Sequence, residues 1–305
     1  MSHHHDHVLR DPLVDDPVLF KQLTTRPAVA WPTMTVLFVT VIPIMVLYVL
    51  AVIGTISPVW SGILAGCIGY FTFSSIHDGL HRSVSTINWV NETVCVATNF
   101  LIFPYLATDI IRWGHMQHHR FAGEEGKDPD LFIARNIWHV LTVGFIWDFY
   151  YVWRYFQHSS ERPERELRKA KIRFVTGIAL VVGIAVFLPP GAIIFWFLSS
   201  RIGLFTIALV FMYLPHQPHI VAQKDAPYQA TIIRTGWDRF MTFFMAYQNW
   251  HLVHHLYPTV PFYRYKQVWK ARAKFHESHR PARVSAFSLK PYDMQLPEGV
   301  QPIRH

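Results

Sequence analysis

Residues 27–76 read PAVAWPTMTVLFVTVIPIMVLYVLAVIGTISPVWSGILAGCIGYFTFSSI and contain no Asp, Glu, Lys or Arg. A helix needs about 20 largely apolar residues to cross roughly 30 Å of hydrocarbon. The stretch is therefore long enough for two crossings, which we place near 33–53 and 59–76, with a turn at TISP (55–58). This pattern predicts an integral membrane protein.

A second apolar block supports the same interpretation. It runs without charge over 174–200, resumes after Arg201 to residue 215, and is broken by the PPG sequence at 189–191. We expect two more crossings here, four in all, in a chain of 305 residues that is 51% hydrophobic and only 16% charged. Because a charge at mid-bilayer is costly, we expect Arg201 near the far interface or paired inside the protein.

Four crossings place every long polar segment on one side of the bilayer. The two connecting turns carry no charge, whereas 161–173 (ERPERELRKAKIR) is rich in Lys and Arg, which makes that side cytoplasmic. We expect both termini there, in the inner (cytoplasmic) membrane of a bacterium. The formal net charge of +8 then reflects this orientation and attraction to membrane lipids rather than nucleic-acid binding. The alternative that we consider is that this positive charge forms a docking surface for an acidic electron carrier.

Two stretches with aromatic and weakly polar composition, 88–107 and 131–158, are expected to lie along the membrane interface. If either one crossed alone, the polar segments on its two sides would end up in different compartments. This placement keeps the histidine-rich motifs of the chain on one face of the bilayer.

Four short motifs contain these histidines, and all four follow a span or lie in a polar segment. On a helix, positions i, i+3 and i+4 share a face, so HxxHH presents three imidazoles to one side. The motifs are HDGLH with His77 and His81, GHMQHH with His115, His118 and His119, PHQPH with His216 and His219, and WHLVHH with His251, His254 and His255.

Neutral imidazole is the commonest transition-metal ligand. A single buried histidine is more often a hydrogen-bonded core residue, but three clusters at helical spacing favour metal binding. One zinc ion is satisfied by four ligands, so eight or nine imidazoles predict two metal ions. Spacing leaves the metal open, since imidazole suits zinc, copper, iron and nickel.

A metal pair at the cytoplasmic mouth of a helical bundle suits oxidation of a hydrocarbon that arrives from the lipid. Unactivated C–H bonds lie beyond side-chain acids and bases, so the metal would carry the difficult step. A membrane metal transporter would place its ligands near mid-bilayer, and a bis-histidine haem protein needs histidines inside the spans. The first two predicted spans, 33–53 and 59–76, contain none.

In this order and between paired spans, HDGLH, GHMQHH and NWHLVHH resemble the histidine boxes of the membrane-bound fatty acid desaturase and hydroxylase superfamily, over about residues 30–275. YLPHQP (213–218), DPDLF (128–132) and QNWHLVHHLYPTVPFYRYK (248–266) resemble the desaturase-like β-carotene hydroxylases most. One position departs from the pattern of acyl-CoA desaturases, which carry Asn where this chain has Met212.

The resemblance implies an all-α fold: an integral membrane bundle of four transmembrane helices with a cytoplasmic helical cap that holds a histidine-rich dimetal site. It implies two non-haem iron ions, O2 as co-substrate, and electrons from an external donor such as a ferredoxin-like carrier. The expected activity is hydroxylation of a β-carotene-type ring, with desaturation of an acyl lipid as the alternative. The implied ligands are His77, His81, His115, His118, His119, His251, His254 and His255, with His216 as the ninth and His219 as its alternative.

Four further residues are candidates for hydrogen bonds to the ligand imidazoles: Asp78, Asp128, Asp130 and Asn249. Asp128 and Asp130 also fit a simple turn, since they flank a proline in GKDPD.

We divide the chain into a polar N-terminal arm (1–27), a membrane domain (28–275) and a C-terminal tail (276–305). His276 and His279 in the basic tail are expected at the surface, and His3, His4, His5 and His7 are excluded from the chemistry.

Overall fold

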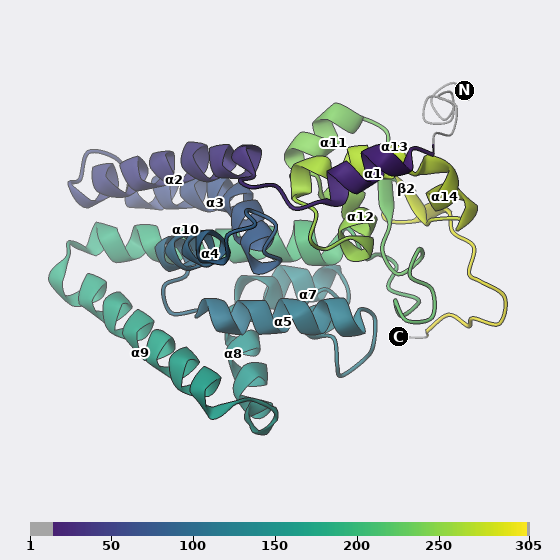
Figure 1. Cartoon of the computed structure of the whole chain (residues 1–305). Coiled ribbons are helices and arrows are strands. Elements are labelled where there is room, and N and C mark those ends of the chain that lie inside the picture. Colours follow the sequence, from purple (N-terminus) through teal and green to yellow (C-terminus); the bar gives the residue numbers. More distant parts are fainter. Residues whose placement is uncertain (1–14, 304–305) are drawn as a thin grey trace.

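Four long helices form the body of the molecule in the computed structural model, which describes residues 15–303. Each is long and apolar enough to cross a membrane, so the four predicted crossings are confirmed by length and composition. Figure 1 shows three of them side by side, while the fourth, α9, diverges from α10 after their connecting turn. The four are α2 (Trp31–Val52), α3 (Pro58–Leu80), α9 (Glu164–Phe187) and α10 (Pro190–Ile207), the last continued by a π-helix, η3 (Ala208–Tyr213).

Glycines on α3 allow it to approach α10 closely. A Cβ built at Gly66 would lie 2.6 Å from the Cβ of Ile202, and one at Gly62 would lie 2.9 Å from the carbonyl oxygen of Phe195. Two small residues four apart are the usual device for close helix packing in lipid, where no hydrophobic force drives helices together. The contact sets the spacing between α3 and α10, the two helices that lead into the motifs of His77 and His216.

The helices within 88–107 and 131–158 are shorter than the spans, and their placement along the membrane interface stays a prediction. Within residues 15–303 no helix besides the four has the length and composition of a span. Trp138, Phe149 and Trp153 are exposed, as suits a membrane interface. The shorter helices between α3 and α9 are α4 (Asn88–Ile102), α5 (Thr108–Phe121), α6 (Pro129–Ile133), α7 (Ile137–Thr142), η1 (Val143–Phe145), α8 (Trp147–Gln157) and η2 (Ser159–Glu161).

Arg201 of α10 is paired inside the protein, which was one of its two expected placements. Its Nη2 lies 2.6 Å from Oδ2 of Asp148, which is fully buried, and its Nη1 donates to the carbonyl oxygen of Phe145 at 3.0 Å. Tyr105 donates its hydroxyl to the same carboxylate. The pair anchors the start of α8 against α10.

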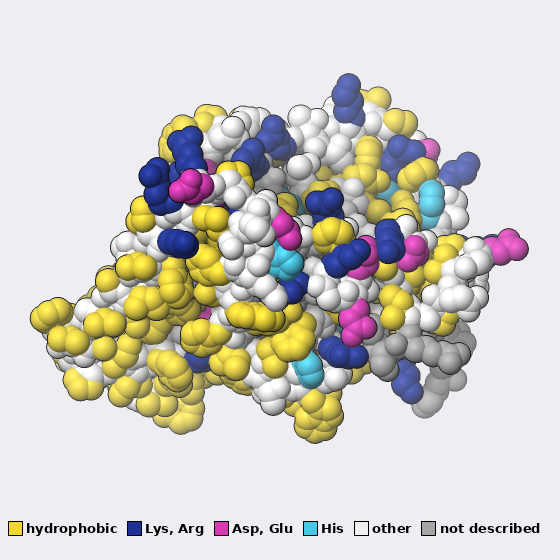
Figure 2. All heavy atoms as spheres, turned by 90° about the horizontal axis from the view of Figure 1, so that it is seen from below, with side chains coloured by type: hydrophobic (Ala, Val, Ile, Leu, Met, Phe, Trp, Pro, Cys, Tyr) yellow, Lys and Arg dark blue, Asp and Glu magenta, His cyan; other side chains and the backbone are white. Residues whose placement is uncertain are grey.

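The remaining elements form a cap at the polar end of the bundle. Figure 2 shows hydrophobic side chains over the spanning part of one face, whereas charged side chains gather over the rest. The cap helices are α1 (Pro17–Thr24), α11 (Asp238–Phe244), η4 (Gln248–Trp250), α12 (His251–Leu256), η5 (Phe262–Arg264), α13 (Tyr265–Ala271) and α14 (Ala273–Ser278).

A small sheet in the cap is an addition to the expected all-helical fold. β1 (Ile233–Thr235) pairs in parallel with β2 (Arg283–Ser285), which pairs antiparallel with β3 (Pro291–Asp293). Three-residue strands are too short to show the alternation that predicts a strand. Two of the three strands, β2 and β3, come from the tail that begins at residue 276.

The expected surface position of His276 is wrong, although that of His279 is confirmed. His276 is fully buried, with its Nδ1 3.1 Å from the Tyr228 hydroxyl and its ring stacked on Trp269 at 4.5 Å. The basic composition of the tail concealed this burial, because the covering residues, such as Phe20 of α1, are distant in sequence. His3, His4, His5 and His7 lie outside the described residues.

The α3–α10 contact generates a stability prediction. Replacing Gly66 with Ala forces a methyl group against Ile202, and overpacking of this kind costs about 1–3 kcal/mol, so the thermal unfolding midpoint in detergent should fall. Gly69→Ala is the matched control on the same helix, since a Cβ there meets nothing within 4 Å and Ala favours helix by about 1 kcal/mol. Equal midpoints for the two variants would contradict the packing argument.

Candidate metal centre

Four elements bring nine histidines together at the polar end of the spans. His77 lies in the last turn of α3 and His81 caps that helix. α5 carries the first HxxHH motif and α12 the second. His216 follows η3, a π-helix, and such irregular turns are frequent at functional sites.

The first group of imidazoles consists of His77, His81, His115 and His254, which are all buried and whose ligand nitrogens lie within 4.8 Å of one another. His119 joins them as a fifth member, because its Nε2 is 2.7 Å from Nε2 of His254. It is the one ligand candidate of the nine that is only partly buried.

The second group consists of His118, His216, His251 and His255, with the same 4.8 Å limit on the distances between ligand nitrogens. His216, the nominated ninth ligand, is therefore placed with the others. The ring centroid of its alternative, His219, lies 5.9 Å from that of His216, and His219 is a member of neither group.

The two HxxHH helices divide their histidines in opposite ways. On α5, the i and i+4 residues His115 and His119 serve the first group, and His118 serves the second. On α12, His251 and His255 serve the second group, and His254 serves the first. Each helix therefore runs between the two groups and contributes to both.

Outward-facing nitrogens fix the orientation of several rings. Nδ1 of His118 donates to Asp128 Oδ1 at 2.9 Å, Nδ1 of His251 to Gln248 Oε1 at 2.5 Å, and Nδ1 of His255 to Gln223 Oε1 at 2.6 Å. Because an amide oxygen accepts and cannot donate, the rings of His251 and His255 place their hydrogens on Nδ1 and turn a lone pair on Nε2 inward. Nδ1 of His254 is 3.0 Å from the hydroxyl of Tyr265.

These inward lone pairs point at one another. Nε2 of His255 is 3.2 Å from Nε2 of His118 and 3.1 Å from Nε2 of His251. With the protons of His251 and His255 held on Nδ1, no hydrogen bond links the Nε2 atoms of these two rings, and a buried acceptor without a partner costs about 1–3 kcal/mol. A cation between the rings turns this repulsion into coordination. The donor set, neutral nitrogen throughout, fits zinc, copper, iron or nickel.

Burial keeps most of the imidazoles neutral. For seven of them, burial and then the neighbouring histidines lower the pKa well below 6.5, which leaves lone pairs available at neutral pH. These seven lie outside the spans: His81, His115, His119, His216, His251, His254 and His255.

The pKa of His118 shifts in the opposite direction. Burial alone would lower its pKa, but the carboxylates of Asp128 and Asp130 outweigh that effect and raise the pKa to about 9. The two carboxylates therefore favour positive charge at this ring. A bound metal ion supplies the same charge without a proton on Nε2.

Two of the four candidate hydrogen-bonding residues lie beside this ring. Asp128 also accepts from the backbone N–H groups of Gly123 and Asp130, each at 2.9 Å. Asp130 Oδ2 is 3.8 Å from Nδ1 of His118, and its carboxylate accepts from the Tyr151 hydroxyl. Asp128 therefore both stabilises the turn of GKDPD and contacts His118, a ligand candidate.

The other two candidates have different partners. Asp78 accepts from Thr33 Oγ1 at 2.7 Å and from the Phe262 N–H at 3.2 Å, so it joins α3 to α2 and to η5. Asn249 donates to Thr242 Oγ1 at 3.1 Å. One residue along a helix is a turn of about 100°, which directs Asp78 away from the face that carries His77.

Sequence reasoning missed Gln248, Gln223 and Tyr265. Gln248 carried a usable signal, because it precedes His251 by three residues in QNWHLVHH. Gln223 and Tyr265 carried none, since they belong to separate segments of the cap.

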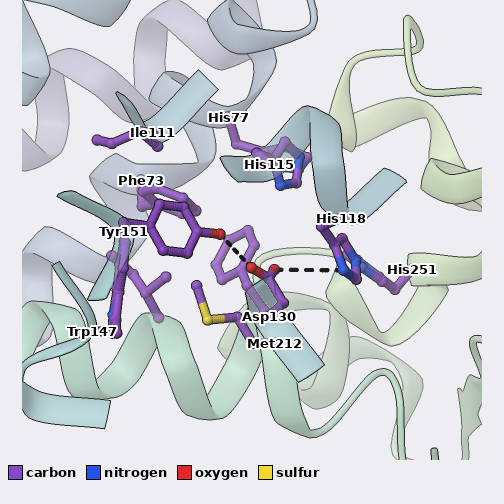
Figure 3. Close-up of a pocket in the computed structure, with 12 residues that line it drawn as sticks. Phe73, His77, Ile111, His115, His118, Asp130, Trp147, Tyr151, Met212 and His251 are labelled. Carbon is purple, nitrogen blue, oxygen red and sulfur yellow. Dashed lines mark hydrogen bonds and ion pairs between the residues drawn. The ribbon is translucent and has the colours of Figure 1, made fainter. Parts of the chain in front are cut away.

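A small cavity of about 20 Å³, room for about one water molecule, lies against the histidines. Four imidazoles, those of His77, His115, His118 and His251, form one part of its lining. Figure 3 shows the Tyr151 hydroxyl directed at Asp130, and Asp130 directed at His118. The rest of the lining is apolar: Phe73, Ile111, Trp147, Ile207, Phe211 and Met212.

Tyr151 reaches the cavity because α5 has a glycine where α8 crosses it. A Cβ at Gly114 would lie 2.1 Å from Cε1 of Tyr151. Glycine directly before the first histidine of GHMQHH therefore makes room for the tyrosine ring.

Comparison with known proteins agrees with this geometry. The model of the fatty acid desaturase family matches residues 54–286, a range that includes all nine histidines and more than half of the chain. Among curated proteins, none matches the chain. The histidine clusters and the four spans are those of an oxidoreductase of the desaturase and hydroxylase type, and the chain belongs to the fatty acid desaturase family.

Proposed function

We propose that the chain hydroxylates a ring carbon of a β-carotene-type carotenoid at a pair of iron ions. The observation that carries this proposal is the cavity, whose lining is imidazole with Asp130 and Tyr151 on one side and aromatic or aliphatic on the other. None of the described lining residues is Lys or Arg, so the cavity suits an uncharged hydrocarbon. Desaturation of an acyl lipid is the alternative.

The nine histidines would hold the two ions, with His77, His81, His115, His119 and His254 around one and His118, His216, His251 and His255 around the other. When bound, the iron pair would supply activation of O2 and the oxidising power for an unactivated C–H bond. We propose a ferredoxin-like carrier as the electron donor, and a cytoplasmic position of the cap in a bacterial inner membrane.

The side chains around the cavity have separate tasks in this proposal. Phe73, Trp147 and Phe211 exclude water and hold the hydrocarbon. Trp147 is itself fixed by a bond from its Nε1 to the carbonyl oxygen of Leu204 at 2.9 Å. Tyr151 and Asp130 hold a proton between the cavity and His118.

Two features favour the carotenoid over the acyl substrate. The motifs YLPHQP and DPDLF resemble carotenoid hydroxylases, and Met212, which departs from the acyl-CoA desaturase pattern, lines the cavity. Metal transport is not favoured, because most of the ligand candidates lie on α5 and α12, beyond the spans.

Expression in a host that accumulates β-carotene tests the substrate. We expect hydroxylated pigments, cryptoxanthin or zeaxanthin, in extracts analysed by chromatography and mass spectrometry. The His118→Ala variant, which removes the ligand candidate beside Asp128, should yield none. Unchanged pigment together with new double bonds in the lipid acyl chains would reject the carotenoid in favour of the alternative.

A pair of neighbouring histidines tests the ligand assignment. His216→Ala should lower the iron content of the purified protein and abolish turnover, because it removes one of four imidazoles in the second group. His219→Ala serves as the control and should keep both. Elemental analysis gives the iron content independently of activity, and the reverse pattern would transfer the ninth ligand to His219.

The carboxylate beside His118 should tune metal affinity. Asp128→Asn keeps an oxygen for the Nδ1 hydrogen bond but removes the negative charge, so iron affinity should fall about 10- to 100-fold, the usual effect of losing such a partner. Competition with a chelator measures it. Asp109→Asn is the control on α5, the helix that carries His118, because Asp109 pairs with Arg173 and not with a histidine. Equal affinities in both variants would remove Asp128 from this role.

A further inference from the structure

A cluster of exposed aromatic side chains lies on the cap and is used by nothing described so far. We call it the α11 patch: Trp237, Phe240, Phe243 and Phe244, with Phe287 from the chain beyond β2. Trp237 is 68% exposed, Phe243 65% and Phe287 70%. Their rings form one surface, since Phe240 lies 4.3 Å from Phe244 and 6.2 Å from Phe287 between centroids. Contiguous exposed apolar surface of this kind marks an interaction site.

The α11 patch is continuous with a membrane span. The ring of Phe243 lies 5.6 Å from that of Phe71 on α3, and Tyr70 donates its hydroxyl to the carbonyl oxygen of Phe244. At 1.5 Å per residue, Phe71 lies about 20 Å along α3 from Pro58, well inside roughly 30 Å of hydrocarbon. α11 therefore touches the bundle at the depth of the acyl chains.

The opposite side of α11 is packed against the bundle. Met241 and Met245 are buried and contact Val210 and Leu214, at the end of the α10 segment. A helix of this length is too short to cross a bilayer. With one face packed and the other aromatic, it has the character of a segment that lies in the interface.

We propose that the α11 patch inserts into the leaflet on the cap side of the membrane, with lipid acyl chains as its occupant. Continuity with α3 favours lipid over a second copy of the chain. Trp237 at the start of the helix suits the headgroup level, where tryptophan is enriched. Arg239 is exposed on the same helix and can extend its charged end to the headgroups.

This placement brings lipid close to the cavity. Val210 and Leu214 support α11, while Phe211 and Met212, on the same turn, line the cavity. One short helix thus separates acyl chains from the apolar wall of the site.

Depth-dependent quenching tests the insertion. In a Cys67→Ser background, with the buried Cys95 retained, Phe240→Cys carries an environment-sensitive NBD label in phosphatidylcholine vesicles. Lipids with a nitroxide near the top of the acyl chain should quench this label strongly, with a blue-shifted emission. Lys274→Cys, exposed on α14, is the control and should remain unquenched.

A second label site, Phe287→Cys, guards against a local effect at residue 240 and should be quenched in the same way. Labels at 240 and 287 that are no more quenched than the one at 274 would overturn the proposal. A blue-shifted but unquenched label would also overturn it, because it would show a protein partner on the patch. The assay uses neither substrate nor metal, so its outcome is independent of the proposed reaction.

Discussion

Lone pairs of buried imidazoles that face one another are the constraint on which the rest of the structure depends. Gln223 and Gln248 hold protons on the outer nitrogens of His255 and His251, so the inner lone pairs of these two rings face each other at 3.1 Å. Such an arrangement is unfavourable in a dry interior unless a cation occupies it. Burial of nine histidines costs desolvation free energy, and coordination of metal ions would offset that cost.

The spans serve this arrangement by fixing where their polar ends lie. Gly62 and Gly66 let α3 pack closely on α10, the two helices that lead into the motifs of His77 and His216. α5 and α12 then close the site from the cap. Because each HxxHH helix gives its i and i+4 residues to one group and its i+3 residue to the other, neither group can form without both helices. The two groups are therefore mechanically coupled.

The sequence predicts the spans and the histidines because both depend on local patterns: charge-free length in one case and helical spacing in the other. It does not predict the division of the histidines. HxxHH places three rings on one broad face, yet in the structure His118 belongs to the second group while His115 and His119 belong to the first. Gln223, Tyr265 and the partners of His276 come from separate segments, and long-range contacts of this kind leave no periodicity to read. The sheet is missed for the same reason, since its strands gain their stability from pairing across about 50 residues.

The two groups are not electrostatically equivalent, and the difference bears on how the site works. Asp128 and Asp130 lie within 3.8 Å of Nδ1 of His118 in the second group, whereas in the first group His254 meets the neutral hydroxyl of Tyr265. Positive charge is therefore favoured more strongly in the second group. Asp130 also accepts a hydrogen bond from Tyr151, and both residues line the cavity. The group in which positive charge is more strongly favoured is therefore joined to the cavity by a chain of groups that carry exchangeable protons. Imidazoles of both groups line the cavity beside its apolar wall, so the wall can exclude water while this chain offers a route for protons.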